Sequence, residues 1–224
     1  MSSIAEYFTS QIEADLNWRE LEMAILRKQL HQTLAGSPQE LTFLRTNLAM
    51  IYAHYEGFCK FALGTYIDAL EKLSLKRSNL RWSLASSSLG SFLAEMRKIT
   101  DTGEYFTKLL SELESHLNEP ARYERPDNIA NLWPDLLVEW LTRLGLDTTN
   151  VQQEKLRLDT LVRNRNQIAH GKRLSVADRA ELDRHAHAAT LAMHEVAVGI
   201  ANALEQKSYA RHATVMTILS HAVV

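Results

Sequence analysis

The chain has 224 residues, of which eight are glycine and four are proline. The fraction of the chain that these two residues make up is less than half of the usual value, which is roughly 12%. Sheet proteins need many turns, and turns depend on Gly and Pro, so the composition excludes an all-β sandwich or barrel. A net charge of −2 excludes a uniformly basic nucleic-acid-binding protein, so any surface for an anionic partner must be local. The single cysteine, Cys59, excludes an intrachain disulfide and a cysteine-based zinc site, and it favours a reducing, cytoplasmic environment.

Membrane segments are not expected. The N-terminal residues lack the basic start and the apolar core of a signal peptide. The most apolar long window, residues 191–204, is interrupted by His194 and Glu195 and is shorter than the ~20 apolar residues that cross a bilayer. We therefore expect a soluble, cytoplasmic protein with no membrane partner.

Two capping boxes mark the starts of the first two helices. Residues 3–6 (Ser-Ile-Ala-Glu) predict a helix that runs to about residue 35. Residues 37–40 (Ser-Pro-Gln-Glu) predict a second start, with proline at the first helical position, where its missing N–H is tolerated. Apolar residues then recur at helical spacing, so this second helix is expected to reach about residue 75.

The middle of the chain predicts shorter helices around an irregular crossover. Residues 78–100 are less regular, and a helix is expected to start at residues 101–104 (Asp-Thr-Gly-Glu). That helix ends before residues 120–134, which hold three of the four prolines and form the crossover. A short helix then opens at Pro134 and stops at Gly145.

Two further helices complete the prediction. Asn150 is expected to cap a helix that runs to His170 and stops at Gly171, because glycine commonly takes the left-handed position that ends a helix. Ser175 is expected to cap a long last helix of roughly residues 176–206.

These elements predict an all-α protein in which residues 1–224 form a single helical bundle of about six to eight helices. A short tail helix is expected within residues 207–224. The chain contains no internal repeat and no heptad run long enough for a coiled coil.

Residues 161–173 (LVRNRNQIAHGKR) differ from the rest of the chain, since they hold four fixed positive charges and one histidine but no acid. A local basic site of this kind attracts phosphate, and its histidine can move a proton near neutral pH. Arg165 lies off the main polar face unless the helix loosens at its end, which Gly171 favours. On a continuous helix that face carries four side chains: Arg163, Asn166, Gln167 and His170.

Arg165 and Asn166, followed by His170, resemble the R-N-x-x-x-H signature of HEPN domains. These domains form an α-helical superfamily with many ribonucleases of prokaryotic toxin and phage-defence systems. The bare spacing from arginine to histidine is unspecific. The specificity comes from the neighbours: an asparagine after the arginine, Ile-Ala before the histidine and a glycine after it.

A second segment strengthens the resemblance. Residues 52–60 (YAHYEGFCK) are similar to the second helix of the MAE-like HEPN group, which carries an Ala-His-aromatic-Glu-Gly run. Residues 128–131 (NIAN), followed by an apolar helix, also fit the central region of that group. The resemblance covers roughly residues 40–205, which leaves residues 1–35 as a generic helix and residues 207–224 unmatched.

The resemblance implies a metal-independent endoribonuclease without a cofactor. The ribose 2′-hydroxyl of RNA is then the nucleophile, His170 transfers protons and Arg165 contacts the phosphate, with Asn166 as the third catalytic residue of the signature. Three further cations are expected to bind RNA phosphates: Arg163, Lys172 and Arg173.

The resemblance also implies a homodimer in which both motifs face one cleft, because one chain supplies only one such histidine. We expect a toxin or phage-defence effector that acts on RNA and is restrained by a partner protein such as an antitoxin. The alternative is a catalytically silent HEPN dimer that binds RNA or a partner protein. Glu56 either orients Arg165 or His170, or is a polar residue satisfied within a pair of helices.

A metal site is not predicted. His185 and His187 are two residues apart and point to nearly opposite sides of a helix. His194 and Glu195 lack the second histidine of the zinc-protease pattern, and the chain has no Walker loop or dinucleotide fingerprint.

Overall fold

The computed structural model describes residues 4–128, 130–172, 176 and 178–211. Within these residues the chain forms nine α-helices and no strand, which confirms the all-α prediction. The helices outnumber the expected six to eight because three of them have only five to seven residues. They are α1 (Ile4–His31), α2 (Pro38–Lys72), α3 (Trp82–Ser87), α4 (Gly90–Met96), α5 (Thr102–Asn118), α6 (Pro134–Arg143), α7 (Thr149–Gln153), α8 (Lys155–Ala169) and α9 (Arg179–Glu205).

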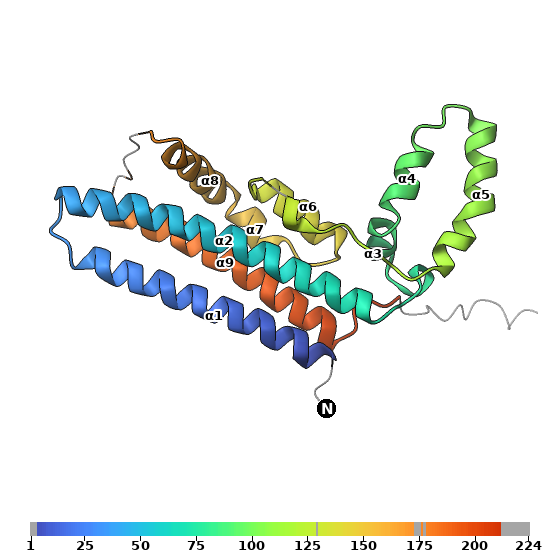
Figure 1. Ribbon diagram of the computed structural model, residues 1–224, viewed down its shortest axis with the longest axis horizontal. Helices are drawn as coiled ribbons and strands as arrows, with labels where there is room; N and C mark the ends of the chain where they lie inside the picture. Colours follow the sequence, from blue (N-terminus) through green and yellow to red (C-terminus); the bar gives the residue numbers. More distant parts are fainter. Residues whose placement is uncertain (1–3, 129, 173–175, 177, 212–224) are drawn as a thin grey trace, which may run out of the picture.

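The long helices α1, α2 and α9 lie side by side, and α6, α7 and α8 lie along the opposite side of α2 and α9 (Figure 1). Helix α2 is the centre of the bundle, since it contacts α1, α8 and α9. It therefore buries residues around most of its circumference, among them the aromatic side chains of Tyr52, Tyr55, Phe58 and Tyr66.

Helices α4 and α5 project away from this bundle (Figure 1). A second, smaller cluster of buried side chains joins them, built on Leu89, Phe92 and Met96 and covered by leucines of α5. Between α5 and α6 the predicted crossover contains only a short 3-10 turn, Pro126–Asn128, among its described residues. A similar turn, Arg77–Asn79, follows α2.

The caps predicted at Ser37 and Asp101 are confirmed. Each side chain accepts a hydrogen bond from the backbone N–H three residues later, at 3.1 and 2.8 Å. The Glu40 carboxylate accepts the backbone N–H of Gly36 at 2.6 Å and pairs with Arg179 at 2.6 Å. This carboxylate therefore ties the turn between α1 and α2 to the first residue of α9.

The helix predicted from Asn150 to His170 is wrong, because the structure divides it into α7 and α8 at Glu154. Its predicted cap is also wrong. The backbone N–H groups of Asn150 and Val151 donate to the carboxylate of Glu195 on α9, at 2.8 and 2.7 Å. The start of α7 is thus capped by a side chain that lies 45 residues away in sequence.

The other boundaries differ by a few residues. Helix α9 begins at Arg179 because the Asp178 carboxylate accepts the N–H of Glu181 at 2.7 Å, whereas the expected start was residue 176. The expected caps Ser3 and Ser175 lie outside the described residues. Helices α1 and α2 end at His31 and Lys72, a turn earlier than predicted. Residues 207–211 contain no helix, and the rest of the predicted tail helix falls outside the described residues.

His185 makes the stability of the bundle sensitive to acid. Its side chain on α9 is only 4% exposed, and burial lowers its pKa below the ordinary 6.5, against the weaker opposite effect of Glu181 at 3.8 Å. Below about pH 6.5 the unfolded chain therefore binds a proton that the folded chain does not, so stability falls as the pH falls.

We expect the free energy of unfolding to fall between pH 7 and pH 5, with His185 responsible for part of the decrease. Urea denaturation at the two pH values measures this difference. His185→Leu should remove that part of the pH dependence, whereas His187→Leu, at an exposed position on the same helix, should not. An unchanged pH dependence in His185→Leu would contradict the expectation.

Candidate functional site

The R-N-x-x-x-H segment forms the last two turns of α8. The apolar face of α8, with Leu158, Leu161 and Val162, is buried against α2 and α9. This packing leaves Arg163 and His170 exposed, while Arg165 and Asn166 are half-buried. The predicted site is therefore at a helix end that the core holds in place.

The end of α8 has the geometry that Gly171 predicts. Gly171 has φ +73°, and its N–H donates to the carbonyl of Ile168 at 3.0 Å, while the N–H of Lys172 donates to that of Gln167 at 3.0 Å. These two bonds make a Schellman motif. His170 is the C-cap residue, so its backbone is fixed although its side chain is exposed.

Three neutral groups hold the guanidinium of Arg165. It stacks on the ring of Tyr52, 4.4 Å from the ring centre. Its Nη1 donates to the Oδ1 atoms of Asn131, at 3.2 Å, and of Asn166, at 2.9 Å. Since no ion pair within the described residues involves Arg165, its positive charge is positioned without being neutralised. Asn166, the second residue of the signature, thus orients the first.

Tyr52 is the centre of this network. Its side chain is fully buried, and its hydroxyl accepts the N–H of Leu132 at 3.2 Å and lies 3.5 Å from Asn131 Oδ1. Burial raises the pKa of Tyr52, and a hydrogen bond to the Glu56 carboxylate raises it further. The hydroxyl therefore stays protonated, and Tyr52 joins α2, α8 and the segment before α6.

Glu56 contacts the site only through Tyr52. Besides its hydrogen bond to that hydroxyl, it forms an ion pair with Lys60 at 2.5 Å. Neither contact is with Arg165 or His170. Any orienting role of Glu56 therefore acts on Arg165 through the Tyr52 ring.

The other part of the Ala-His-Tyr-Glu-Gly run faces α1. His54 is buried, with its Nε2 atom 2.9 Å from the Glu22 carboxylate, and burial lowers its pKa. Gly57 lies under Arg19, where a Cβ atom would come within 2.7 Å of the guanidinium. Residues 52–57 therefore serve two helix contacts, with Tyr52 and Glu56 near α8 and His54 and Gly57 against α1.

The remaining predicted residues lie near the end of α8. Arg163 and Lys172 are exposed, and the backbone carbonyl of Lys172 accepts a hydrogen bond from Arg45 of α2 at 3.1 Å. Arg173 lies outside the described residues. Tyr52 and Asn131 were missed by the sequence analysis, although both belong to segments that carry the family resemblance.

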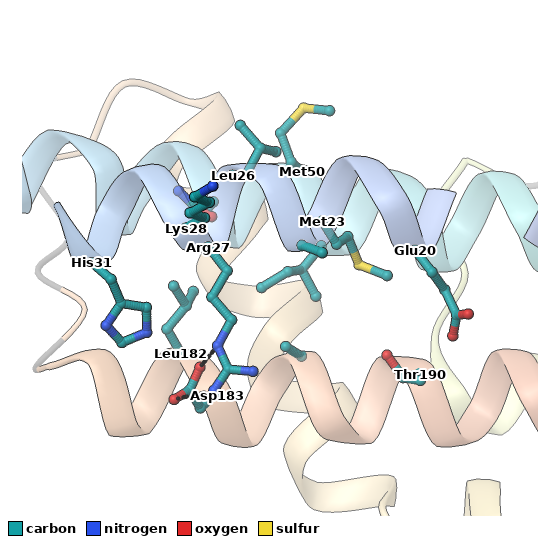
Figure 2. A pocket seen from close by; sticks show the side chains of 14 residues that line it. Glu20, Met23, Leu26, Arg27, Lys28, His31, Met50, Leu182, Asp183 and Thr190 are labelled. Carbon is teal, nitrogen blue, oxygen red and sulfur yellow. Dashed lines mark hydrogen bonds and ion pairs between the residues drawn. The ribbon is translucent and has the colours of Figure 1, made fainter. Parts of the chain in front are cut away.

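A groove of about 500 Å³ between α1 and α9 is separate from this site (Figure 2). Its floor is mainly apolar, with Met23, Ile51 and Leu182, and the ion pair of Arg27 with Asp183 crosses it. No residue of α8 lines it. Within the described ranges, no three His, Cys, Asp or Glu side chains group as metal ligands would. None of the helices described is long and apolar enough to cross a membrane.

Gly171→Ala is expected to disturb the end of α8, although the added methyl group would not clash with any neighbouring atom. Nothing lies within 4 Å of a Cβ atom at this position, so the cost is the left-handed backbone alone, about 1 kcal/mol. We expect a lower melting temperature, because the Schellman motif fixes the backbone at the end of α8. Gly171→Asn, which tolerates this conformation better, should lower the melting temperature less. Equal losses in the two variants would contradict the backbone explanation.

Comparison with protein families gives a match over most of the chain. A family model of MAE-like HEPN domains matches residues 8–209. This range includes most of α1, so the similarity extends beyond the predicted residues 40–205. Comparisons with curated proteins and with solved structures give no match.

Proposed function

The chain belongs to the MAE-like HEPN family, and we propose that it is a metal-independent endoribonuclease that uses the 2′-hydroxyl of its RNA substrate as the nucleophile. The observation that carries this proposal is the guanidinium of Arg165, which neutral groups hold in place on the same helix end as the exposed His170. A fixed positive charge of this kind stabilises the extra negative charge of a phosphorane.

In the proposed reaction, the 2′-oxygen attacks the phosphorus and loses its proton to a base. The bond to the 5′-oxygen breaks, and an acid gives that oxygen a proton. The products are a 2′,3′-cyclic phosphate and a 5′-hydroxyl. His170 has the right chemistry for either proton transfer, and Arg165 contacts the non-bridging phosphate oxygens. The exposed Arg163 and Lys172 attract the neighbouring phosphates of the RNA.

We propose further that two chains form the complete site, since acid and base act on opposite sides of the phosphorus and each chain has one histidine here. Membership in this family supports a role as a toxin or phage-defence effector restrained by a partner protein such as an antitoxin. The alternative function is a silent dimer that binds RNA or a partner protein. The exposed cations favour this alternative as well, because they would hold RNA without cleaving it.

The test is the metal and substrate requirement of the purified protein. Cleavage should continue in excess chelator, because the proposed chemistry uses only protein groups and the RNA hydroxyl. An RNA with a single 2′-deoxy nucleotide at the cut site should bind but stay intact, and the unmodified control should give cyclic phosphate ends. Cleavage of the deoxy substrate at the same position would rule out this mechanism. Binding without cleavage of either substrate would favour the silent dimer.

A further inference from the structure

The arginines that the fold buries, fully or in part, are paired with acids except at one place. Six arginines of the described residues are buried or half-buried. Four of them form ion pairs with carboxylates: Arg19, Arg77, Arg125 and Arg179. The other two, Arg45 and Arg165, form no ion pair in the part of the chain that the structure describes. Both lie where α2 meets the end of α8, so the two unneutralised guanidiniums belong to one region.

Arg45 uses little of its hydrogen-bonding capacity within the protein. Its Nη2 donates to the backbone carbonyl of Lys172 at 3.1 Å, in a bond that lies at the surface. Its Nε is buried and has no hydrogen-bond partner among the described residues. A guanidinium has five N–H donors in a rigid fork that matches the oxygens of a phosphate. Arg45 therefore holds the segment after α8 through one donor and keeps others for an anion.

The contacts of Arg45 and Tyr52 show that α2 and α8 run antiparallel at this end (Figure 1). Tyr52 of α2 meets Arg165 of α8. Arg45 and Tyr52 are two turns apart on α2, about 10 Å along its axis. Lys172, which Arg45 meets, follows Arg165 by the same number of residues, and His170 lies between them. One unneutralised arginine is therefore placed on each side of the histidine.

The two segments that face each other here carry no acid. Residues 41–55 of α2 and residues 160–172, which include the end of α8, contain no Asp or Glu. Glu40, the acid just before this part of α2, is already paired with Arg179. The local field therefore favours an anion, although the whole chain is slightly acidic. The two segments together hold four fixed positive charges: Arg45, Arg163, Arg165 and Lys172.

We propose that Arg45 is a second phosphate-binding arginine of the RNA site. This inference rests on the proposed action on RNA. Arg165 contacts the phosphate that is cleaved, and Arg45 binds a neighbouring phosphate of the same strand. Because Arg45 has no carboxylate partner, its contact with a phosphate breaks no ion pair of the protein. The RNA strand is then held on both sides of His170.

The salt dependence of RNA binding tests this assignment. The probe is a short labelled single-stranded RNA, and all chains carry His170→Ala so that it stays intact. Adding Arg45→Gln should weaken binding about 10-fold. It should also lower the slope of log Kd against log salt by about 0.7, the contribution of one phosphate contact with a single strand. Glutamine retains an N–H donor for the carbonyl of Lys172 while the charge is lost. An unchanged slope would overturn the proposal.

Two matched variants separate phosphate binding from a purely structural role. Arg45→Lys keeps the charge and should keep the slope, although it loses the fork of donors. Arg97→Gln on α4 removes an exposed arginine and should change neither the Kd nor the slope. A lower melting temperature in both Arg45 variants, with the slope unchanged in both, would assign Arg45 to the fold alone and overturn the proposal.

Chemical protection gives a second measurement that needs no substitution at residue 45. Phenylglyoxal modifies accessible arginines, and mass spectrometry locates the modified residues. Saturating RNA should protect Arg45 and leave Arg97 reactive, whereas equal modification of Arg45 with and without RNA would overturn the proposal. RNA that is bound through Arg45 but left intact by the unaltered chain would count against the ribonuclease alone. RNA that is cleaved, with a slope that Arg45→Gln does not change, would count against Arg45 alone.

Discussion

His170→Ala is expected to lower the rate of RNA cleavage by about 10²- to 10⁴-fold, the usual contribution of one general acid or base. The protein should stay folded, because the His170 side chain is exposed at the end of α8 and fills no core position. Single-turnover cleavage measures the chemical step, and thermal unfolding measures the fold. Cleavage at the full rate by purified His170→Ala protein would disprove the proposed catalytic role.

Three other substitutions test whether the loss of cleavage is specific to the residues of the proposed site. His187→Ala removes an exposed histidine from α9 and should leave cleavage unchanged. Arg165→Ala should cost nearly as much activity as His170→Ala, since it removes the positioned guanidinium. Arg163→Ala should weaken RNA binding more than turnover, because Arg163 is exposed and makes no contact with Tyr52, Asn131 or Asn166 in the structure.

The parts of the fold that follow from local chemistry could be predicted. The caps at Ser37 and Asp101 and the left-handed Gly171 each depend on backbone groups within a few residues. The start of α7 could not be predicted in this way. Its cap is Glu195, and only the packing of α9 brings that carboxylate to Asn150.

The site shows the same division. The segments that form it were recognisable, because the R-N-x-x-x-H residues and the Ala-His-Tyr-Glu-Gly run are short and local. The contacts between them were not, since the Tyr52 ring meets Arg165 across two helices and Asn131 comes from a segment without regular structure. A stacking partner leaves no spacing signal in the sequence.

Mixed dimers provide the strongest test of a shared catalytic site. If cleavage needs His170 from both chains, an equal mixture of unaltered and His170→Ala chains should keep about one quarter of the activity after exchange, because only one dimer in four has both histidines. Independent sites would keep about one half. The measurement is the cleavage rate across a series of mixing ratios at fixed total protein.

The way the cleavage rate depends on the mixing ratio distinguishes a shared site from two independent sites. A quadratic dependence on the fraction of unaltered chain indicates a site that needs two histidines, and a straight line indicates that each chain acts alone. His187→Ala chains are the mixing control, since they retain His170 and should leave the rate unchanged at every ratio. A quadratic curve would assign the shared site to the ends of α8, where merging two copies doubles the positive charge available to RNA.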